Sequence, residues 1–249
     1  MGCEQITEED CKYMKRRKRR TGMTVKEFIF QTRPYFEDWI TRSVYHSNAI
    51  EGNTLSYAET YAILWNDNSF QIKATARELY EATNLKYALN YALEHLDEEL
   101  SEAFIIEIAR RINRNIDEID GYRTVQVFIQ GAEHLPPAPA LVKNQMMYFV
   151  YNYHHTVYSD IFEKMAVTHL AFERIHPFAD GNGRTGRVLL SFELLRNGYL
   201  PIVIPQESRT DYFRLLAEQN AGGLAEFFRQ CHQTELERAK AFGFEAEQL

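Results

Sequence analysis

The sequence predicts a mainly α-helical fold that contains one short β-hairpin. Apolar residues recur at helical spacing through most of the chain from residue 24 onward. Only residues 121–140 combine β-branched and aromatic residues with a following glycine and several prolines, a pattern typical of a hairpin. With 249 residues, the chain can form one domain with an added segment or two small domains.

The predicted helices follow one another with short connections. The first well-marked helix covers residues 34–50, and Gly52 and Asn53 end it. Thr54 or Ser56 is expected to cap the next helix. Further helices are predicted at about 74–97, 101–116, 141–157, 160–175, 182–197 and 209–240.

Composition and charge exclude several classes of protein. The net charge of −7 argues against a nucleic-acid binder, and the absence of a run of 18 apolar residues argues against a membrane span. No apolar segment typical of a secretory signal begins the chain, and Cys3, Cys11 and Cys231 form no CxxC pair. We therefore expect a cytoplasmic protein without disulfides or a zinc ribbon.

The basic run within residues 12–20 is the one feature that points elsewhere. Its cationic core, residues 15–20, offers a contact for nucleic acid or anionic lipid. Because it lies near the terminus and carries little aromatic content, a solvated, flexible tail over residues 1–23 is the favoured interpretation.

The most informative stretch is residues 176–187, His-Pro-Phe-Ala-Asp-Gly-Asn-Gly-Arg-Thr-Gly-Arg, called the motif loop below. Gly181, Asn182 and Gly183 stand where a helix begins, so unpaired backbone N–H groups and the positive end of the helix dipole favour an anion there. Arg184 and Arg187 are three residues apart and project from one face of this helix. Two guanidinium groups suit the oxygens of a di- or triphosphate.

Two further residues of the motif loop supply chemistry. Asp180 offers an oxygen ligand for Mg²⁺, which needs few protein ligands when phosphates provide others. His176 can accept the proton of an attacking hydroxyl. Phe178 is expected only to anchor the loop in the core. Residues 181–186 also match the dinucleotide pattern G-x-G-x-x-G, but no strand precedes them, so that interpretation is rejected.

The motif loop resembles the Fic family signature H-x-F-x-D/E-G-N-G-R-x-x-R and matches it at every defined position. The resemblance covers roughly residues 30–235, including His134-Leu-Pro-Pro of the hairpin. It implies a Fic-type helical bundle and a protein adenylyltransferase, which transfers AMP from ATP to a Ser, Thr or Tyr hydroxyl of a target protein, and of itself, and releases pyrophosphate.

The resemblance also implies roles for single residues. His176 is the base, and Asp180 holds Mg²⁺, with Mn²⁺ as an alternative ion. Gly181, Asn182 and Gly183 contact the α- and β-phosphates. The whole ATP-binding set implied by position is Asp180, Gly181, Asn182, Gly183, Arg184, Thr185, Gly186, Arg187, Tyr212 and Asn220, the last two on the adenosine side.

In the family the hairpin is a flap over the active site, so residues 121–140 are called the flap below. An exposed strand edge offers backbone groups with which an extended target segment can pair. The residues expected to bind the target are Val127, Phe128, Ile129, Gln130 and Gly131.

Residues 47–53, Ser-Asn-Ala-Ile-Glu-Gly-Asn, resemble the inhibitory motif of the family, S/T-x-x-x-E-G/N. Ser47 and Glu51 are four residues apart and face the same way near a helix end. We expect Glu51 to pair with Arg187 and to hold ATP in an unreactive pose. The chain would then be of the type whose inhibitory helix, about residues 34–52, precedes the catalytic core.

The predicted organisation is a tail (1–23), a helical region with the inhibitory helix (24–100), the catalytic core (101–240) and a C-terminal tail (241–249). Removal of AMP, or transfer of another nucleotide or phosphate group, remains open, because an inhibitory glutamate can also assist a water molecule. A nucleic-acid-associated regulatory protein is the remote alternative. The identity of the target and the assembly of several copies are not determined by the sequence.

Overall fold

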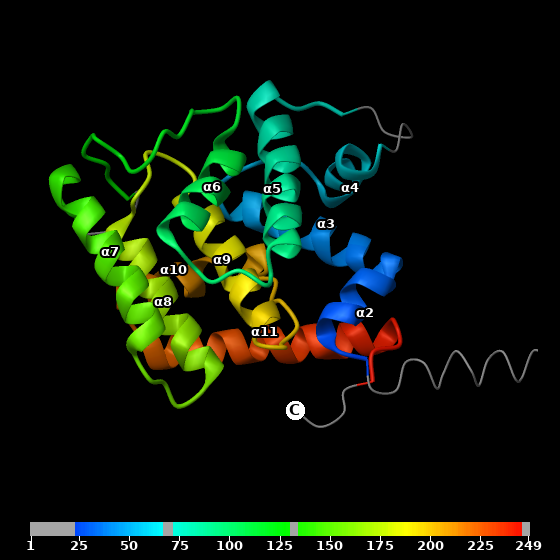
Figure 1. The fold of residues 1–249 in the computed structure, drawn as a ribbon. Coiled ribbons are helices and arrows are strands. Elements are labelled where there is room, and N and C mark those ends of the chain that lie inside the picture. Colours follow the sequence, from blue (N-terminus) through cyan, green and yellow to red (C-terminus); the bar gives the residue numbers. More distant parts are fainter. Residues whose placement is uncertain (1–22, 67–71, 130–133, 246–249) are drawn as a thin grey trace, which may run out of the picture.

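The computed structural model describes residues 23–66, 72–129 and 134–245 (Figure 1). No residue in these ranges lies in a strand, so the mainly α class is confirmed. The helices are α2 (Val25–Gln31), α3 (Arg33–Ile50), α4 (Tyr57–Trp65), α5 (Ala76–Glu94), α6 (Glu102–Asn113), α7 (Pro139–His155), α8 (Ile161–Ile175), α9 (Asn182–Arg196), the 3₁₀ turn η1 (Gln206–Ser208), α10 (Arg209–Ala217) and α11 (Ala221–Ala241).

Several of these helices begin at the capping residues that the sequence predicts. Ser56, rather than Thr54, caps α4 and forms a capping box with Glu59. Thr54 instead donates to Glu78 at 2.6 Å, which links the loop after α3 to the start of α5. Asp160 caps α8 by accepting from the first turn.

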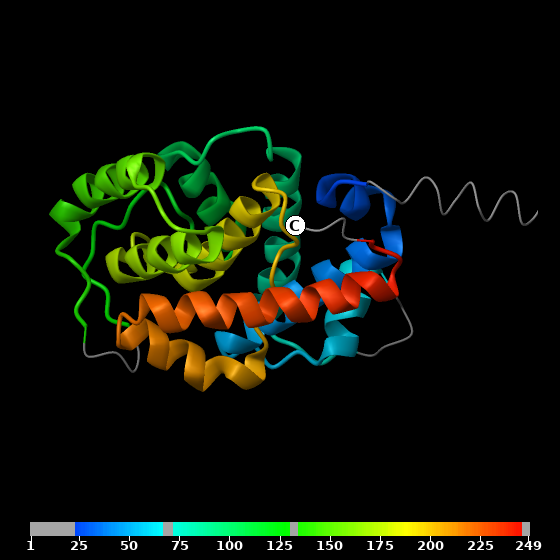
Figure 2. The ribbon, with the colours of Figure 1, turned by 90° about the horizontal axis from the view of Figure 1, so that it is seen from below.

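The helix α9 lies at the centre of the bundle and packs against α3, α5, α6 and α8. It is buried almost all round, so its first turn is held in a fixed place. Figure 2 shows α11 running along one face of the bundle, where it packs against α8 and α10. Core residues from Val25 to Phe244 form one hydrophobic cluster, which joins the N-terminal helical region to the rest.

The helix α3, which carries the inhibitory motif, is anchored at both ends. Near its start, the Tyr35 hydroxyl donates to Glu235 of α11 at 2.7 Å. The Arg42 guanidinium donates to both oxygens of the same buried carboxylate. At its end, Arg209 donates to the carbonyl oxygen of Ile50 at 2.8 Å. The helix is therefore fixed against the core on either side of the inhibitory motif.

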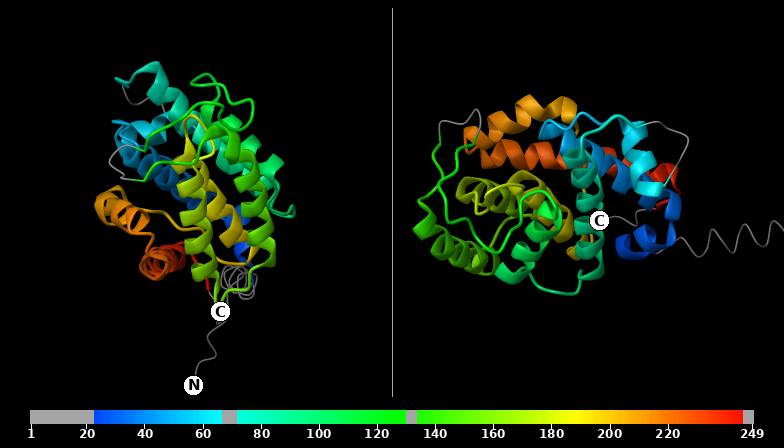
Figure 3. Two further views of the ribbon diagram at one scale, coloured as in Figure 1. Left: turned by 90° about the vertical axis from the view of Figure 1, so that its left-hand side faces the viewer. Right: turned by 90° about the horizontal axis from the view of Figure 1, so that it is seen from above.

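The predicted hairpin is wrong for the described part of the flap. Residues 121–129 and 134–138 form no strand, although they lie beside the motif loop at the same end of the bundle (Figure 3). Side chains join the two segments in place of a backbone ladder: Arg123 donates to the carbonyl oxygens of Val125 and Pro137. Gln126 donates to that of Pro136. Prolines lack the N–H groups that a ladder needs, which explains the difference.

One predicted helix needs correction, and one prediction is not tested. The helical region 209–240 is two helices, α10 and α11, because the chain turns at Glu218–Asn220 and Asn220 begins a new helix. The predicted tail, with its basic run, Cys3 and Cys11, lies outside the described residues apart from Met23. Across 23–66, 72–129 and 134–245, none of the helices combines the length and apolar content needed to cross a bilayer.

Candidate functional site

The motif loop begins where α8 ends. His176 closes α8 in the left-handed conformation, with φ 51°, a strained geometry for a residue with a side chain. Arg123 of the flap holds this turn by donating to the carbonyl oxygen of His176 at 2.8 Å, and its backbone N–H donates to Pro177 at 2.9 Å. The flap and the loop are therefore one unit.

The imidazole of His176 is prepared to accept a proton. Its Nδ1 lies 3.3 Å from the carbonyl oxygen of Glu173, an acceptor only, so Nδ1 carries the hydrogen and Nε2 the lone pair. Burial lowers the pKa of His176, and the bond to Glu173 opposes this only in part. The ring is consequently neutral at neutral pH.

The bend of the loop is fixed by amide side chains. Asn182 accepts from the N–H of Phe178 and donates to its carbonyl oxygen, both at 2.9 Å. Phe178 is fully buried, as its expected anchoring role requires. Asn113 of α6 donates to the carbonyl oxygen of Asp180 at 3.2 Å. The side chain of Asn182 therefore shapes the loop, and only its backbone is left for an anion.

The first turn of α9 allows a ligand to approach its backbone closely. Its N-cap, Gly181, has φ 77°, and a Cβ there would lie 2.6 Å from Asn113 Nδ2, so only glycine fits. No side chain in the described part of the chain caps α9. The first N–H groups of a central helix thus remain directed out of its end, which is the arrangement that binds anions.

The ion pair expected between Glu51 and Arg187 is present, with Oε1 and Nη2 2.6 Å apart. Ser47 of α3 contacts the same guanidinium twice: its hydroxyl accepts from Nε at 2.8 Å and its carbonyl oxygen from Nη2 at 3.0 Å. Arg187 is 8% exposed, whereas the carboxylate of Glu51 is 34% exposed. The inhibitory motif therefore covers the inner arginine of the motif loop.

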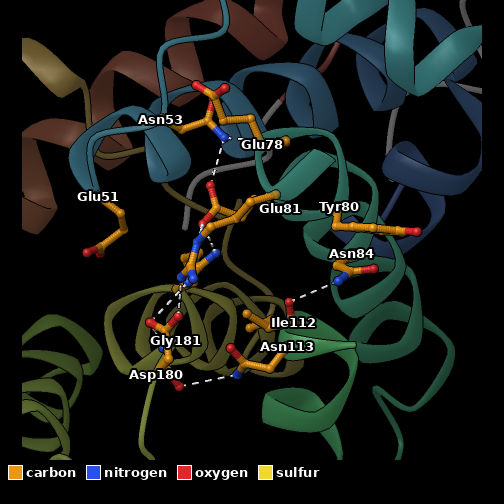
Figure 4. A network of polar contacts seen from close by, with 12 residues as sticks. Glu51, Asn53, Glu78, Tyr80, Glu81, Asn84, Ile112, Asn113, Asp180 and Gly181 are labelled. Atoms are coloured by element: carbon orange, nitrogen blue, oxygen red, sulfur yellow. Dashed lines mark hydrogen bonds and ion pairs between the residues drawn. The ribbon is translucent and has the colours of Figure 1, made fainter. Parts of the chain in front are cut away.

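Asp180 and Arg184 of the motif loop belong to a separate group of charged residues beside α5. Figure 4 shows Asp180 and Glu81 of this group. Asp180 pairs with Arg77 of α5 and, at 3.3 Å, with Arg184. Burial raises the pKa of Asp180, but Arg184, the N–H of Gly181 and Arg77 together lower it further, so the carboxyl is ionised.

Asp180 is a single carboxylate, and the described ranges hold no group of three or more His, Cys, Asp or Glu side chains arranged for a metal ion. This donor set fits Mg²⁺ or Mn²⁺ bound jointly with phosphates, and it does not fit an all-protein metal site.

Three residues of the implied ATP-binding set are buried, and a fourth caps a helix other than α9. Thr185 is fully buried, and Gly186 faces His169 and Glu173 in the core. Tyr212 is fully buried behind Arg187, and its hydroxyl lies 2.6 Å from His169 Nε2. Asn220 is exposed and caps α11 by accepting from Gly223.

Of the predicted target-binding residues, Phe128 is 79% exposed and lies in an irregular segment with Val127 and Ile129. Gln130 and Gly131 lie outside the described residues. The exposure of Phe128 leaves a large apolar side chain on the outer surface of the flap.

Several neighbours of the motif loop were not predicted. Arg123, Asn113, Arg77 and Glu81 reach the motif loop from other elements, and no local pattern marks them. Glu173 is a largely buried carboxyl whose Oε1 has no hydrogen-bond partner in the described chain. Burial raises the pKa of Glu173 to about 7, against the lowering effect of Arg187. Only an acidic residue within an apolar helix face could have drawn attention to it.

Residues 99–194 match the Fic/DOC family. Protein adenylyltransferase fic-1 of Caenorhabditis briggsae is 37% identical over 194 residues, which are 75% of this chain and 38% of that protein. Protein adenylyltransferase Fic of Nematostella vectensis is 36% identical, over 75% of this chain and 44% of that protein. The chain thus spans less than half the length of these relatives.

Solved structures of other proteins have the same fold. Fic-1 from Caenorhabditis elegans superimposes with a TM-score of 0.70 at 30% identity, covering 91% of this chain and 68% of that one. A Fic domain containing signaling protein from Bacteroides thetaiotaomicron has the same fold, with a TM-score of 0.77 at 23% identity over 95% of this chain. The family match includes the motif loop, and the shared fold includes the helices that position it. The chain belongs to the Fic/DOC family.

Proposed function

We propose that the protein transfers AMP from ATP to a Ser, Thr or Tyr hydroxyl of a target protein, and of itself, with release of pyrophosphate. One observation carries the proposal: the uncapped first turn of α9 is joined through Asn182 to Phe178, two residues after His176, whose Nε2 carries the lone pair. The printed names of the relatives, protein adenylyltransferases, support the same reaction.

In this reaction the hydroxyl oxygen of the target attacks the α-phosphorus of ATP, and the bond from that phosphorus to the departing pyrophosphate breaks. His176 Nε2 accepts the hydroxyl proton. Arg184 and Arg187 hold the oxygens of the β- and γ-phosphates, and the N–H groups of the first turn of α9 hold the phosphates from the other side. Asp180 would hold Mg²⁺ or Mn²⁺, which would neutralise phosphate charge when bound.

The flap supports a way to place the target hydroxyl without a specific sequence. Within the described segments of the flap, residues 124–129 make no hydrogen bond to another backbone group. An extended target segment can therefore pair with their N–H groups, although they form no strand before it binds. The carbonyl oxygens of Val125 and Val127 already accept from the side chains of Arg123 and Gln126. Phe128 offers an exposed apolar contact beside them.

We also propose that Glu51 inhibits the transfer. Its carboxylate satisfies Arg187, which the γ-phosphate needs, so ATP must either displace Glu51 or bind in another pose. A difference of about 3 kcal/mol between two poses reduces turnover roughly 10²-fold. The three contacts of Ser47 and Glu51 with Arg187 support an effect of this size.

The test is transfer by purified protein incubated with ATP and Mg²⁺, followed by intact mass. Glu51→Gly is expected to raise self-modification by about 10²-fold, and His176→Ala in the same background to abolish it. Glu37→Gln is the matched control, because Glu37 lies on the same helix and, among the described residues, its carboxylate pairs only with exposed Arg33. The mass added per site identifies the group: AMP supports the proposal, and another nucleotide or a phosphate would replace it.

Removal of AMP is a second candidate function, favoured by the position of Glu51 beside the motif loop. A carboxylate at 34% exposure can take a proton from a water molecule as well as pair with Arg187. Incubating an AMP-modified protein with the wild-type chain and following loss of the added mass tests it. If Glu51→Gln removes AMP as fast as wild type, this second function is rejected.

A further inference from the structure

A charge network joins the inhibitory segment to the acidic residue of the motif loop. It consists of Asn53, Arg77, Glu81, Asp180 and Arg184, and we call it the α5 network because Arg77 and Glu81 lie one turn apart on α5. Asn53 follows the inhibitory Glu51 by two residues. Figure 4 shows Glu81 lying between Asn53 and Asp180.

Glu81 is the centre of the α5 network. Its Oε1 lies 3.0 Å from Arg77 Nε and 3.3 Å from Arg184 Nη1, and its Oε2 accepts from Asn53 Nδ2 at 2.8 Å. The carboxylate is 11% exposed. A buried carboxylate is stable only when its oxygens are paired in this way. Glu81 therefore fixes where both guanidinium groups lie.

The charges of the α5 network balance before any metal ion binds. Two carboxylates, Glu81 and Asp180, face two guanidinium groups, Arg77 and Arg184. A divalent cation on Asp180 would need one of its two carboxylate oxygens, and each of these oxygens is already paired with a guanidinium group. One guanidinium must then give up its oxygen.

Only one of the two arginines has room to leave. The side chain of Arg184 is 3% exposed, whereas that of Arg77 is 55% exposed. Arg77 also occupies Oδ2 of Asp180, while Arg184 takes Oδ1 together with the N–H of Gly181. Arg77 is thus the group that a metal ion would displace into solvent.

We propose that Arg77 is a positioning residue that competes with the metal ion for Asp180, and that Glu81 holds it there. The guanidinium keeps Asp180 oriented and paired while no nucleotide is bound. Through Glu81 and Asn53, this pairing is continuous with the inhibitory segment. Binding of metal and release of the inhibitory segment therefore act on the same network. This inference rests on the proposed role of Asp180 as the metal ligand.

The experiment measures Mn²⁺ binding by isothermal titration calorimetry, as the gain in affinity for ATP when ATP is supplied as its Mn²⁺ complex instead of with excess EDTA. His176→Ala is the parent, so that no turnover occurs. Adding Arg77→Ala is expected to tighten Mn²⁺ binding about tenfold, because a competing cation is removed. Arg77→Lys keeps the charge without the two-pronged geometry and is expected to lie between the two.

Two further variants separate the possible outcomes. Arg214→Ala is the matched control, because Arg214 is about equally exposed and also bridges two carboxylates, Asp211 of α10 and Glu218 directly after it. Its Mn²⁺ affinity should equal that of the parent. Asp180→Ala should lose Mn²⁺ affinity by about 10²-fold. If it does not, the proposed metal ligand is wrong, and the inference about Arg77 ends with it.

A second outcome is that Asp180→Ala loses Mn²⁺ affinity, whereas Arg77→Ala binds Mn²⁺ as tightly as the parent or more weakly. This outcome would refute the competition between Arg77 and the metal ion and leave the proposed function in place. A purely structural role of Arg77 would lower the thermal unfolding midpoint without tightening Mn²⁺ binding. Unfolding is therefore followed for each variant alongside the titration.

Discussion

The carboxylate of Glu51 lies against Gly183, so that a Cβ on residue 183 would come within 2.4 Å of Oε1. Gly183 belongs to the first turn of α9, where N–H groups and the helix dipole favour an anion. The inhibitory carboxylate therefore rests where a phosphate would approach, as well as on the arginine that would bind it. The proposed inhibition and the proposed nucleotide binding would use the same space and the same charge.

Ser47→Ala should release part of the inhibition. The substitution removes the acceptor of Arg187 Nε and leaves the pair with Glu51 in place, so self-modification should rise about fivefold, less than in Glu51→Gly. Ser43→Ala is the matched control: Ser43 lies one turn earlier on α3, and its buried hydroxyl has no hydrogen-bond partner in the described chain. Equal rates in wild type and Ser47→Ala would remove Ser47 from the inhibitory contact.

Arg123→Ala should weaken both fold and activity. Arg123 is 5% exposed, and its guanidinium donates to the carbonyl oxygens of Val125, Pro137 and His176. Leaving these acceptors unpaired should cost about 2–4 kcal/mol and lower the unfolding midpoint by about 5–10 °C. Transfer in the Glu51→Gly background should fall more than tenfold, because His176 loses its support.

Arg110→Ala is the control for this prediction. Arg110 is exposed, and within the described chain its side chain donates only to Ile119 and Asp120, so its loss should change the midpoint by less than about 1 °C. A similar fall for both variants would mean that the flap does not depend on Arg123.

The pH dependence of transfer should report His176. Burial places the pKa of His176 below the ordinary 6.5, and the base must be unprotonated to accept a proton. The rate of Glu51→Gly should therefore be constant above neutrality and fall as pH decreases through a value below 6.5. Removing Glu51 also removes a charge that raises this pKa. A single-turnover profile with its midpoint above 7 would contradict the assignment.

Glu173→Gln should stabilise the protein at alkaline pH. Burial raises the pKa of Glu173 from 4.5 to about 7, so the stability contributed by its protonated form is present below 4.5 and is lost as pH rises through 7. Glutamine stays neutral at every pH. The free energy of unfolding of the variant should therefore exceed that of wild type by up to about 3 kcal/mol at pH 8, and the difference should vanish near pH 4. Unfolding midpoints across this range provide the measurement.

The stability of the Glu163→Gln variant relative to wild type should change with pH in the opposite direction. Hydrogen bonds from Ser159 lower the pKa of the exposed Glu163, so its ionised form stabilises the chain above 4.5 and this stability is lost as pH falls. The glutamine variant should therefore lose stability relative to wild type at neutral pH. If both variants change in the same direction with pH, the effect does not come from burial of Glu173.

The sequence by itself determined most of the helices and the motif loop, because both depend on residues close together in the chain. Apolar spacing and caps such as Ser56 and Asp160 act within one or two turns. The residues from His176 to Arg187 are contiguous, so their chemistry can be read directly. The partner of Glu51 was predictable only because the family resemblance supplied it, since 136 positions separate it from Arg187.

Tertiary structure decided what depends on distant partners. Residues 121–129 have strand-like composition, yet their neighbours include prolines without N–H groups, and Arg123 satisfies the carbonyl oxygens that a ladder would use. Arg77 and Glu81 look like ordinary exposed charges of an amphipathic helix. Packing of α5 beside α9 places them on Asp180 and Arg184. Pairing across a fold depends on which surfaces meet, and no local pattern encodes that.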